Sequence, residues 1–288
     1  EFRRVLFRSV KVARLPVQPY GADALKPFGY DLFDEEPSTF APVSDVPVPA
    51  DYVLGPGDQL IVQLFGSQNR THKLVVNAEG RVNVPDIGPV SVVGKTFDAA
   101  RIDIEARIAR QFVGTQGSVS LADTRAIRVF VVGEAKRPGA YTVSGLSTVT
   151  SALYAAGGVK RSGSLRDVQL KRRGQIVRHL DLYDLLLHGD TSNDAPLQSG
   201  DAVFIPPVGP TASVEGEVQR PAIYELRGPT TMASLVGLAG GLTSLADASV
   251  ASLVRVDDQK LRVAINVPLD SANGRDEKIR NGDAVRIG

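Results

Sequence analysis

Three consecutive acidic residues, Asp34-Glu35-Glu36, are the first candidates for chemistry in this 288-residue chain. Two carboxyl groups held at a fixed separation are what a glycoside hydrolase needs to cleave a sugar linkage. The cluster lies in a proline-rich stretch, however, and no predicted helix or strand holds its carboxyl groups at a set distance. We therefore expect a solvated run of charge rather than a catalytic pair.

Phosphate and metal chemistry have equally weak candidates. Gly94-Lys95-Thr96 resembles the tail of a phosphate-binding loop, but the position of its earlier glycine is Pro89, and residues 90–93 read as a strand. The three histidines, His72, His179 and His188, have no metal-ligand spacing and are expected at the surface or at strand edges. The chain contains no cysteine. The sequence thus predicts no catalytic residue, no cofactor and no metal.

The most informative residues occur twice. Gly133-Glu134-x-x-Arg137-Pro138-x-x-Tyr141 returns 83 positions later as Gly216-Glu217-x-x-Arg220-Pro221-x-x-Tyr224. Ala156-Gly157-Gly158 pairs with Ala239-Gly240-Gly241 at the same offset, and Gly200-Asp201-Ala202-Val203 pairs with Gly282-Asp283-Ala284-Val285 at an offset of 82. Three motifs in one order with nearly constant spacing indicate a tandem duplication.

Each copy of the first motif places a glutamate three positions before an arginine at a turn. We expect Glu134 to pair with Arg137 and Glu217 with Arg220, with a proline (Pro138, Pro221) shaping the turn and a tyrosine (Tyr141, Tyr224) packing beneath it. In the alternative interpretation, Arg137 and Arg220 project to a subunit interface or a lumen. A guanidinium group can there bind a carboxylate of a neighbour or an acidic sugar.

The predicted elements that position these motifs are the same in both copies. An apolar strand (127–132; 212–215) leads through the motif to a second strand, and a short helix (148–156; 231–239) ends at Gly-Gly, which supplies a left-handed C-cap. Paired strands follow (168–171 with 176–181; 252–256 with 261–266), and the Gly-Asp-Ala-Val turn leads into the last strand. A sheet of this kind around one helix is a β-grasp arrangement.

A different domain precedes the repeats. Gly55-Pro56-Gly57-Asp58 is a predicted turn at its start, because proline fixes φ and glycine accepts positive φ. Strands are expected at 60–65, 73–77, 81–84, 90–93 and 119–121, with 73–77 and 81–84 joined as a hairpin. Thr96 is the expected N-cap of a helix that ends near Phe112. The fold class predicted for the whole chain is α+β.

Residues 1–50 form an N-terminal arm. Residues 1–14 mix basic and apolar side chains, which is consistent with a membrane-binding segment or, more simply, with a cloning remnant around Glu1-Phe2. Residues 15–50 are rich in proline and are expected to run extended over the surface. Aromatic residues are expected to pin this segment to a neighbouring domain or subunit: Tyr20, Phe28, Tyr30, Phe33 and Phe40.

Two groups of motifs together resemble a known family. Asp51-Tyr52-x-Leu54-Gly55-Pro56-Gly57-Asp58, followed by Gly80-Arg81-Val82-x-Val84-Pro85-x-Ile87-Gly88, is similar to the polysaccharide export domain of outer-membrane exporters. The two Gly-Glu-x-x-Arg-Pro repeats are similar to the SLBB (soluble ligand-binding β-grasp) domains that follow it in that family. The resemblance covers roughly residues 50–288 and implies domains at 51–125, 126–208 and 209–288.

The resemblance implies a Wza-like ring in the periplasm, associated with the outer membrane, through whose aqueous lumen capsular or exopolysaccharide passes. The partners it implies are other copies of the chain, the exported polysaccharide and an inner-membrane polysaccharide co-polymerase. Members of the family reach the outer membrane through a lipidated N-terminal cysteine and a C-terminal amphipathic helix, and this chain has neither. We therefore expect it to be a fragment of a longer exporter.

Composition is consistent with this interpretation. The net charge is +1 with Lys and Arg scattered through the repeats, so nucleic acid is not an expected partner. No apolar run approaches the roughly 18 residues of a membrane-spanning helix. Aromatic residues make up only 6% of the chain, which favours passage of a polymer over tight sugar binding. The predicted function is non-enzymatic polysaccharide export; the alternative is a glycan- or small-ligand-binding β-grasp module.

Overall fold

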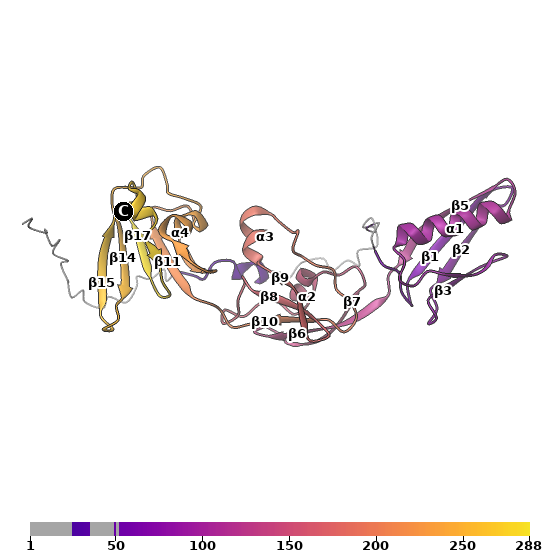
Figure 1. The fold of residues 1–288 in the computed structure, drawn as a ribbon, viewed down its shortest axis with the longest axis horizontal. Helices are drawn as coiled ribbons and strands as arrows, with labels where there is room; N and C mark the ends of the chain where they lie inside the picture. The colour runs from indigo at the N-terminus through magenta and orange to yellow at the C-terminus, as the bar shows by residue number, and fades with distance from the viewer. Residues whose placement is uncertain (1–24, 35–48, 50–51) are drawn as a thin grey trace, which may run out of the picture.

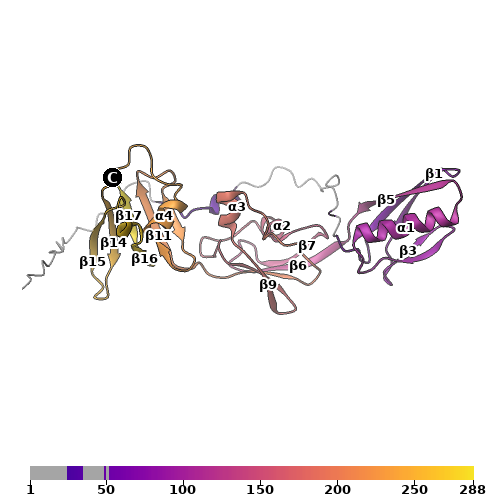
Figure 2. The same ribbon diagram turned by 45° about the horizontal axis from the view of Figure 1, so that its top comes forward.

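The chain folds into three bodies arranged in a row (Figures 1 and 2). The structure is a computed structural model, and it describes residues 25–34, 49 and 52–288. The first domain, built from β1–β5 and α1, lies at one end; the first repeat (β6–β10) lies in the middle, and the second repeat (β11–β17) lies at the other end. The expectations for residues 1–24, 35–48 and 50–51 lie outside the described residues.

The first domain is a small antiparallel sheet covered by one helix. Its strand order is β2-β1-β5, formed by β1 (Gln59–Gly66), β2 (Arg70–Val75) and β5 (Thr115–Asp123). The predicted helix is α1 (Phe97–Gln111), and it buries three side chains at helical spacing: Ala100, Ile104 and Ile108. The hydroxyl of Thr96 accepts a hydrogen bond from the amide of Ala99 at 3.2 Å, which confirms the predicted N-cap.

The predicted hairpin between residues 73–77 and 81–84 is wrong. β3 (Arg81–Val84) pairs with β4 (Gly88–Ser91) in a separate sheet, whereas β2 pairs with β1. Asn77 closes the turn before β3, because its side-chain oxygen accepts hydrogen bonds from the amides of Glu79 and Arg81 at 3.1 and 2.9 Å. The turn therefore directs the chain from one sheet to the other instead of joining two paired strands.

Both repeats form the predicted β-grasp sheet with a helix against it. The strand orders β7-β6-β10-β8-β9 and β12-β11-β17-β14-β15 correspond strand for strand, and the first strand of each repeat runs parallel to its last. The helices α2 (Val149–Ala155) and α4 (Met232–Leu238) are followed by the two Gly-Gly pairs, all four with positive φ as predicted. The first repeat has β6 (Ala126–Gly133), β7 (Gly139–Ser144), β8 (Val168–Arg172), β9 (Gln175–Leu180) and β10 (Ala202–Ile205). The second has β11 (Thr211–Gly216), β12 (Ala222–Glu225), β14 (Ala251–Val256), β15 (Arg262–Val267) and β17 (Ala284–Ile287).

Several short elements were not predicted. A helix follows the hairpin of each repeat, α3 (Leu182–His188) in the first and α5 (Ala272–Arg275) in the second. The second repeat also has a small pair of strands, β13 (Thr230–Thr231) and β16 (Lys278–Ile279). The elements α5, β13 and β16 are too short for a periodic pattern to identify them. The helix α3 is as long as α2 and α4 but lacks the Gly-Gly pair that marks their ends.

Two hydrophobic cores stabilise the described chain. One belongs to the first domain and includes Leu60, Val62 and Ile104. The other runs without a break through both repeats and includes Tyr30 and Phe33 of the N-terminal arm. The two repeats are therefore packed as one unit, whereas the first domain has a core of its own.

Candidate functional site

The repeated motif begins with a glycine at the end of a strand. Gly133 and Gly216 both have φ of 84°. A Cβ atom at these positions would lie 2.1 Å from the carbonyl oxygen of Ile205 and 1.9 Å from that of Ile287. Only glycine fits here, because the parallel neighbouring strand approaches the backbone too closely for a side chain.

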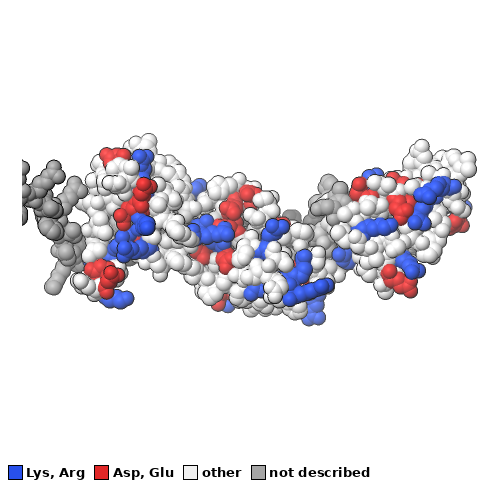
Figure 3. Space-filling view, viewed as in Figure 1, with Lys and Arg blue, Asp and Glu red and all other residues white. Residues whose placement is uncertain are grey.

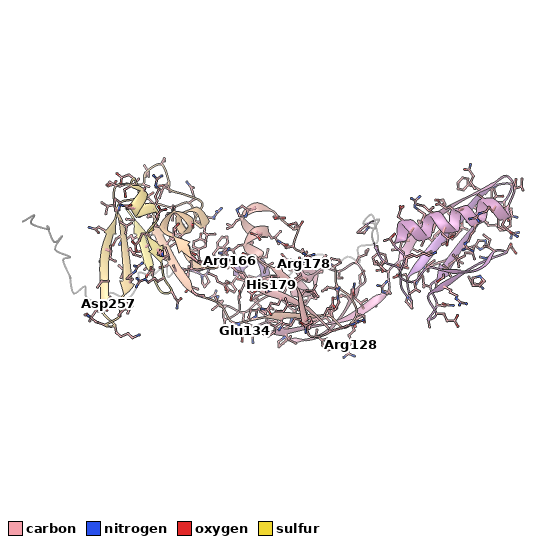
Figure 4. All side chains as sticks on the ribbon, in the orientation of Figure 1. Arg128, Glu134, Arg166, Arg178, His179 and Asp257 are labelled. Carbon is pink, nitrogen blue, oxygen red and sulfur yellow. The ribbon has the colours of Figure 1, made fainter. Side chains whose placement is uncertain are left out.

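The glutamate of the motif binds a hydroxyl group rather than the arginine. Ser162 Oγ donates to Glu134 Oε2 at 2.6 Å, and Thr243 Oγ1 donates to Glu217 Oε2 at 2.5 Å. The predicted pairing of each glutamate with the arginine three positions later is therefore wrong. Each carboxylate instead holds the loop that follows the helix of its repeat. Glu134 is labelled in Figure 4, at the lower edge of the middle body.

The arginine of the motif reaches the C-terminal end of the helix. Arg137 Nη2 donates to Ala155 O at 3.4 Å, and Arg220 Nη2 donates to Leu238 O at 3.3 Å. A cation is favourable there because the helix end carries partial negative charge. The carbonyl oxygen of the same arginine accepts a hydrogen bond from the tyrosine hydroxyl, at 2.5 Å from Tyr141 and 2.6 Å from Tyr224. The motif thus ties a strand, a turn and a helix end together.

Both arginine side chains are exposed, as are the prolines that follow them, Pro138 and Pro221. The remaining guanidinium donors are accessible to solvent. Contact of Arg137 and Arg220 with a neighbouring subunit or with a lumen stays a prediction.

The last repeated motif, Gly-Asp-Ala-Val, contributes a buried carboxylate to each repeat. Arg172 donates two hydrogen bonds of 2.8 Å to Asp201, and Arg255 donates to Asp283 at 3.3 and 2.7 Å. Each aspartate also accepts a backbone amide within its turn, from Gln198 and Arg280 respectively, at 2.8 Å. The aspartates were predicted from the repeat, whereas their arginine partners on β8 and β14 were not, although Arg172 and Arg255 also lie 83 positions apart.

The Gly-Pro-Gly-Asp motif of the first domain holds the junction to the first repeat. Asp58 is fully buried and accepts hydrogen bonds from Tyr52 Oη and the Gly55 amide at 2.8 Å. It also accepts two from Arg125, from the backbone amide and from Nη1, each at 2.7 Å. Burial, with the Asp58 carboxylate beside it, raises the pKa of Tyr52 well above its usual value. Arg125 lies between β5 and β6, and its carbonyl oxygen accepts a hydrogen bond from the Gly145 amide of the first repeat at 2.8 Å, so the cluster ties the first domain to the first repeat.

A second buried cluster joins the two repeats. Glu225 accepts hydrogen bonds from the amides of Leu165 and Gly209, both at 2.9 Å. Arg166, labelled in Figure 4 on the side of the middle body that faces the second repeat, binds Asp181 at 3.0 Å and the carbonyl oxygen of Glu225 at 3.2 Å. No motif in the sequence indicated these residues, because the contacts join positions about sixty residues apart.

Part of the N-terminal arm bridges the same junction, and Phe28, Tyr30 and Phe33 pack against the repeats as predicted. The predicted extended run is wrong for Tyr30–Phe33, which form one turn of 3-10 helix (η1) that buries Tyr30 and Phe33. The arm adds to the edge of β12 through hydrogen bonds of its backbone with Ile223, at 2.9 and 3.0 Å. Phe28 packs on Tyr183 of the first repeat and Tyr224 of the second, with ring centroids 5.1 Å away in both cases. Tyr30 donates to the carbonyl oxygen of Gly163 at 2.6 Å, and burial raises its pKa to about 12, so the donor proton is retained at neutral pH.

Replacing Phe28 with alanine is expected to loosen the second repeat from the first. The ring is half-buried, so the cost should be about 2 kcal/mol, below that of a fully buried phenylalanine. Hydrogen exchange at the Ile223 amide, which donates to the arm at Lys26, should become faster. The matched control is Asp31→Asn, an exposed change in the same arm, and equal protection of Ile223 in both variants would contradict the bridging role.

The residues first considered for chemistry have other roles. Lys95 binds Asp103 at 2.9 Å, next to the capping Thr96. Asp34 binds Lys136 at 3.0 Å, while Glu35 and Glu36 lie outside the described residues. The histidines occupy surface or strand-edge positions as predicted: His72 on β2, His179 on β9 and His188 at the end of α3. In the described ranges, no group of three or more acidic or histidine side chains could hold a metal ion. Within these ranges, too, every helix is too short or too polar to cross a bilayer.

Comparison with protein families agrees with this arrangement. A family described as polysaccharide biosynthesis/export protein matches residues 46–122, and SLBB domains match residues 127–205 and 211–264. The chain therefore belongs to the outer-membrane polysaccharide export proteins that carry an export domain followed by two SLBB domains.

Individual relatives are similar over most of the described chain. The polysialic acid transport protein KpsD of Escherichia coli is 29% identical over 179 residues, which is 62% of this chain and 32% of KpsD. The EPS I polysaccharide export outer membrane protein EpsA of Ralstonia nicotianae is 31% identical over 183 residues, 62% of this chain and 48% of EpsA. The capsule polysaccharide export outer membrane protein CtrA of Neisseria meningitidis is 29% identical over 177 residues, 61% of this chain and 45% of CtrA. The chain thus spans about a third to a half of the length of these relatives.

Proposed function

We propose that this chain is the ring-forming, periplasmic part of an exporter that passes capsular or exopolysaccharide across the outer membrane without chemical change. The observation that carries the proposal is the order of the domains, an export domain followed by two SLBB repeats, in a family whose named members export such polymers. We propose domain limits of 51–125, 126–208 and 209–288. The proposed partners are further copies of the chain, the polymer and an inner-membrane co-polymerase.

The geometry supports a structural role, in which the chain forms part of the wall of a lumen, rather than a catalytic role. Buried polar contacts set both junctions between bodies, Asp58 with Arg125 at one and Glu225 with Leu165 and Gly209 at the other. A subunit that must close a ring with identical neighbours needs such fixed angles, because an angular error at each junction is repeated around the ring. In this interpretation Arg137 and Arg220 contact neighbouring subunits or the lumen.

Deleting the gene from its host is expected to abolish polysaccharide at the cell surface while polymer extracted from lysed cells remains detectable. The reason is that a passive conduit acts after synthesis. Staining of intact cells and analysis of lysates measure the two pools, and a plasmid copy of the gene is the control. Unchanged surface polysaccharide in the deletion strain would rule the proposal out.

Native mass spectrometry of the full-length protein tests the ring. A discrete high-order oligomer supports the ring, whereas a monomer that binds a defined sugar tightly favours the glycan-binding module.

A further inference from the structure

The outer face of the first repeat's sheet combines two aromatic rings, one exposed and one half-buried, with cations. Alternate residues of β6, β10 and β8 point to the core, which leaves Arg128, Phe130, Phe204 and Lys171 on the opposite face. The strand register places Ala202 between Phe130 and Lys171, so these residues form one continuous patch. Lys171 Nζ lies 4.1 Å from the centre of the Phe204 ring, and Arg128 Cζ lies 5.9 Å from that of Phe130. Each cation thus lies beside an apolar ring.

The second repeat builds the same sheet without these side chains. Thr211 and Ser213 occupy the positions of Arg128 and Phe130, 83 residues later, and the register of β17 puts Arg286 and Val254 where the first repeat has Phe204 and Lys171. The signature residues of the fold, in contrast, are identical in both copies. The fold therefore does not require the aromatic and basic patch. An exposed phenylalanine, Phe130, with the half-buried ring of Phe204 on the same solvent-facing side of the sheet, points to a binding surface.

The charges of the patch favour an anionic ligand. Arg173, exposed in the turn between β8 and β9, adds a further cation two residues after Lys171, and Figure 3 shows Lys and Arg gathered over the lower front of the middle body. Figure 4 shows Arg128 at the lower rim of that body. An acidic residue, Asp167, lies near the patch. Its carboxylate is hydrogen-bonded to Gln169 at 2.8 Å and to His179 at 2.5 Å, so it does not pair with the cations of the patch.

We propose that this patch binds acidic polysaccharide, with Arg128 and Lys171 pairing to carboxylate groups and Phe130 and Phe204 contacting the C–H faces of the sugar rings. The inference rests on the proposed export function and adds that the transported polymer is acidic. A charged group and an apolar face on one sugar unit match a cation and a ring held side by side. Exposed contacts of this kind are individually weak, so the polysaccharide can bind at one sugar unit after another and still be transported.

Binding to the intact 288-residue chain tests this directly. Polygalacturonate, an acidic polysaccharide, is compared with neutral dextran and with polyglutamate, an acidic polymer without sugar rings, by isothermal titration calorimetry at low ionic strength. Polygalacturonate should bind most tightly. Arg128→Thr with Lys171→Gln should weaken it roughly tenfold, and Phe130→Ser with Phe204→Leu should bring it close to polyglutamate. Arg286→Gln, which removes a cation from the same face of the second repeat, is the matched control and should change the affinity less than about twofold.

Each other outcome overturns the inference. If dextran binds as well as polygalacturonate, the charge plays no part; if polyglutamate does, the rings play no part. If the patch variants keep full affinity, the polymer binds elsewhere. If they change the sedimentation of the chain instead of its affinity, the patch is a contact between subunits. The deletion experiment above is independent of these outcomes, so loss of the patch and loss of the export function can be told apart. Circular dichroism melting of each variant checks that the sheet is intact, and Thr and Ser are already accommodated at these positions in the second repeat.

Discussion

Asp283→Ala is expected to destabilise the second repeat by about 3–5 kcal/mol, because it removes the carboxylate that pairs with both sides of a buried guanidinium group. The side chains of Arg255 and Asp283 are 8% and 2% exposed, and the carboxylate also accepts the Arg280 amide in the turn before β17. Glu277 keeps one contact with Arg255, at 3.0 Å, so the guanidinium group is not left entirely unpaired. Hydrogen exchange of the full chain, read at the amides of β14 and β17, measures the loss for this repeat alone.

The first repeat supplies the matched control. Asp201→Ala breaks the equivalent pair, but the Arg172 side chain is 31% exposed and water can solvate it after the carboxylate is lost. Its cost, read at β8 and β10, should be about 1–3 kcal/mol. The double change Arg255→Met with Asp283→Asn should recover part of the lost stability, since it removes the unpaired charge and keeps an acceptor for the Arg280 amide. Equal costs for Asp201→Ala and Asp283→Ala would show that burial of the arginine does not set the penalty.

The sequence predicted what is local or repeated. The Gly-Gly helix ends, the Thr96 cap and the strands of both repeats follow from φ preferences, capping chemistry and alternation, all of which operate within a few residues. The duplication added long-range information, because residues kept in both copies, such as Asp201 and Asp283, are those that the shared fold requires.

The errors in prediction concern contacts between distant segments. Glu134 and Arg137 are close in sequence and opposite in charge, yet the glutamate binds Ser162 and the arginine reaches Ala155. Surface ion pairs contribute little, so backbone geometry and helix-end carbonyls decide where these side chains go. Arg166 and Glu225 occur once each, and no repeat or spacing marks them. The repeat does not indicate the proposed binding patch either, because the residues of the patch differ between the two copies.

Asp58→Ala is expected to free the first domain from the first repeat and to cost about 3–5 kcal/mol. The change removes one acceptor that serves four donors, from Tyr52, Gly55 and Arg125, at a position with no exposed surface. The Gly55 amide would then be buried without a partner and the Arg125 amide partly so, which is more costly than loss of the bonds alone. Differential scanning calorimetry of the full chain should show earlier unfolding of the first domain, and small-angle X-ray scattering should show a wider range of molecular dimensions.

The matched control is Asp123→Ala, two residues before Arg125. Asp123 binds Lys73 at 3.4 Å with its side chain 60% exposed, so its loss should cost at most about 1 kcal/mol and leave the scattering unchanged. The comparison also bears on function, because a ring needs one fixed angle between the bodies of every subunit. For the proposed ring of the full-length protein, Asp58→Ala should therefore reduce the amount of high-order oligomer far more than Asp123→Ala does. If Asp58→Ala loosens the junction and the oligomer still forms normally, ring closure does not depend on this angle, and the argument from rigid junctions to a ring-forming wall fails.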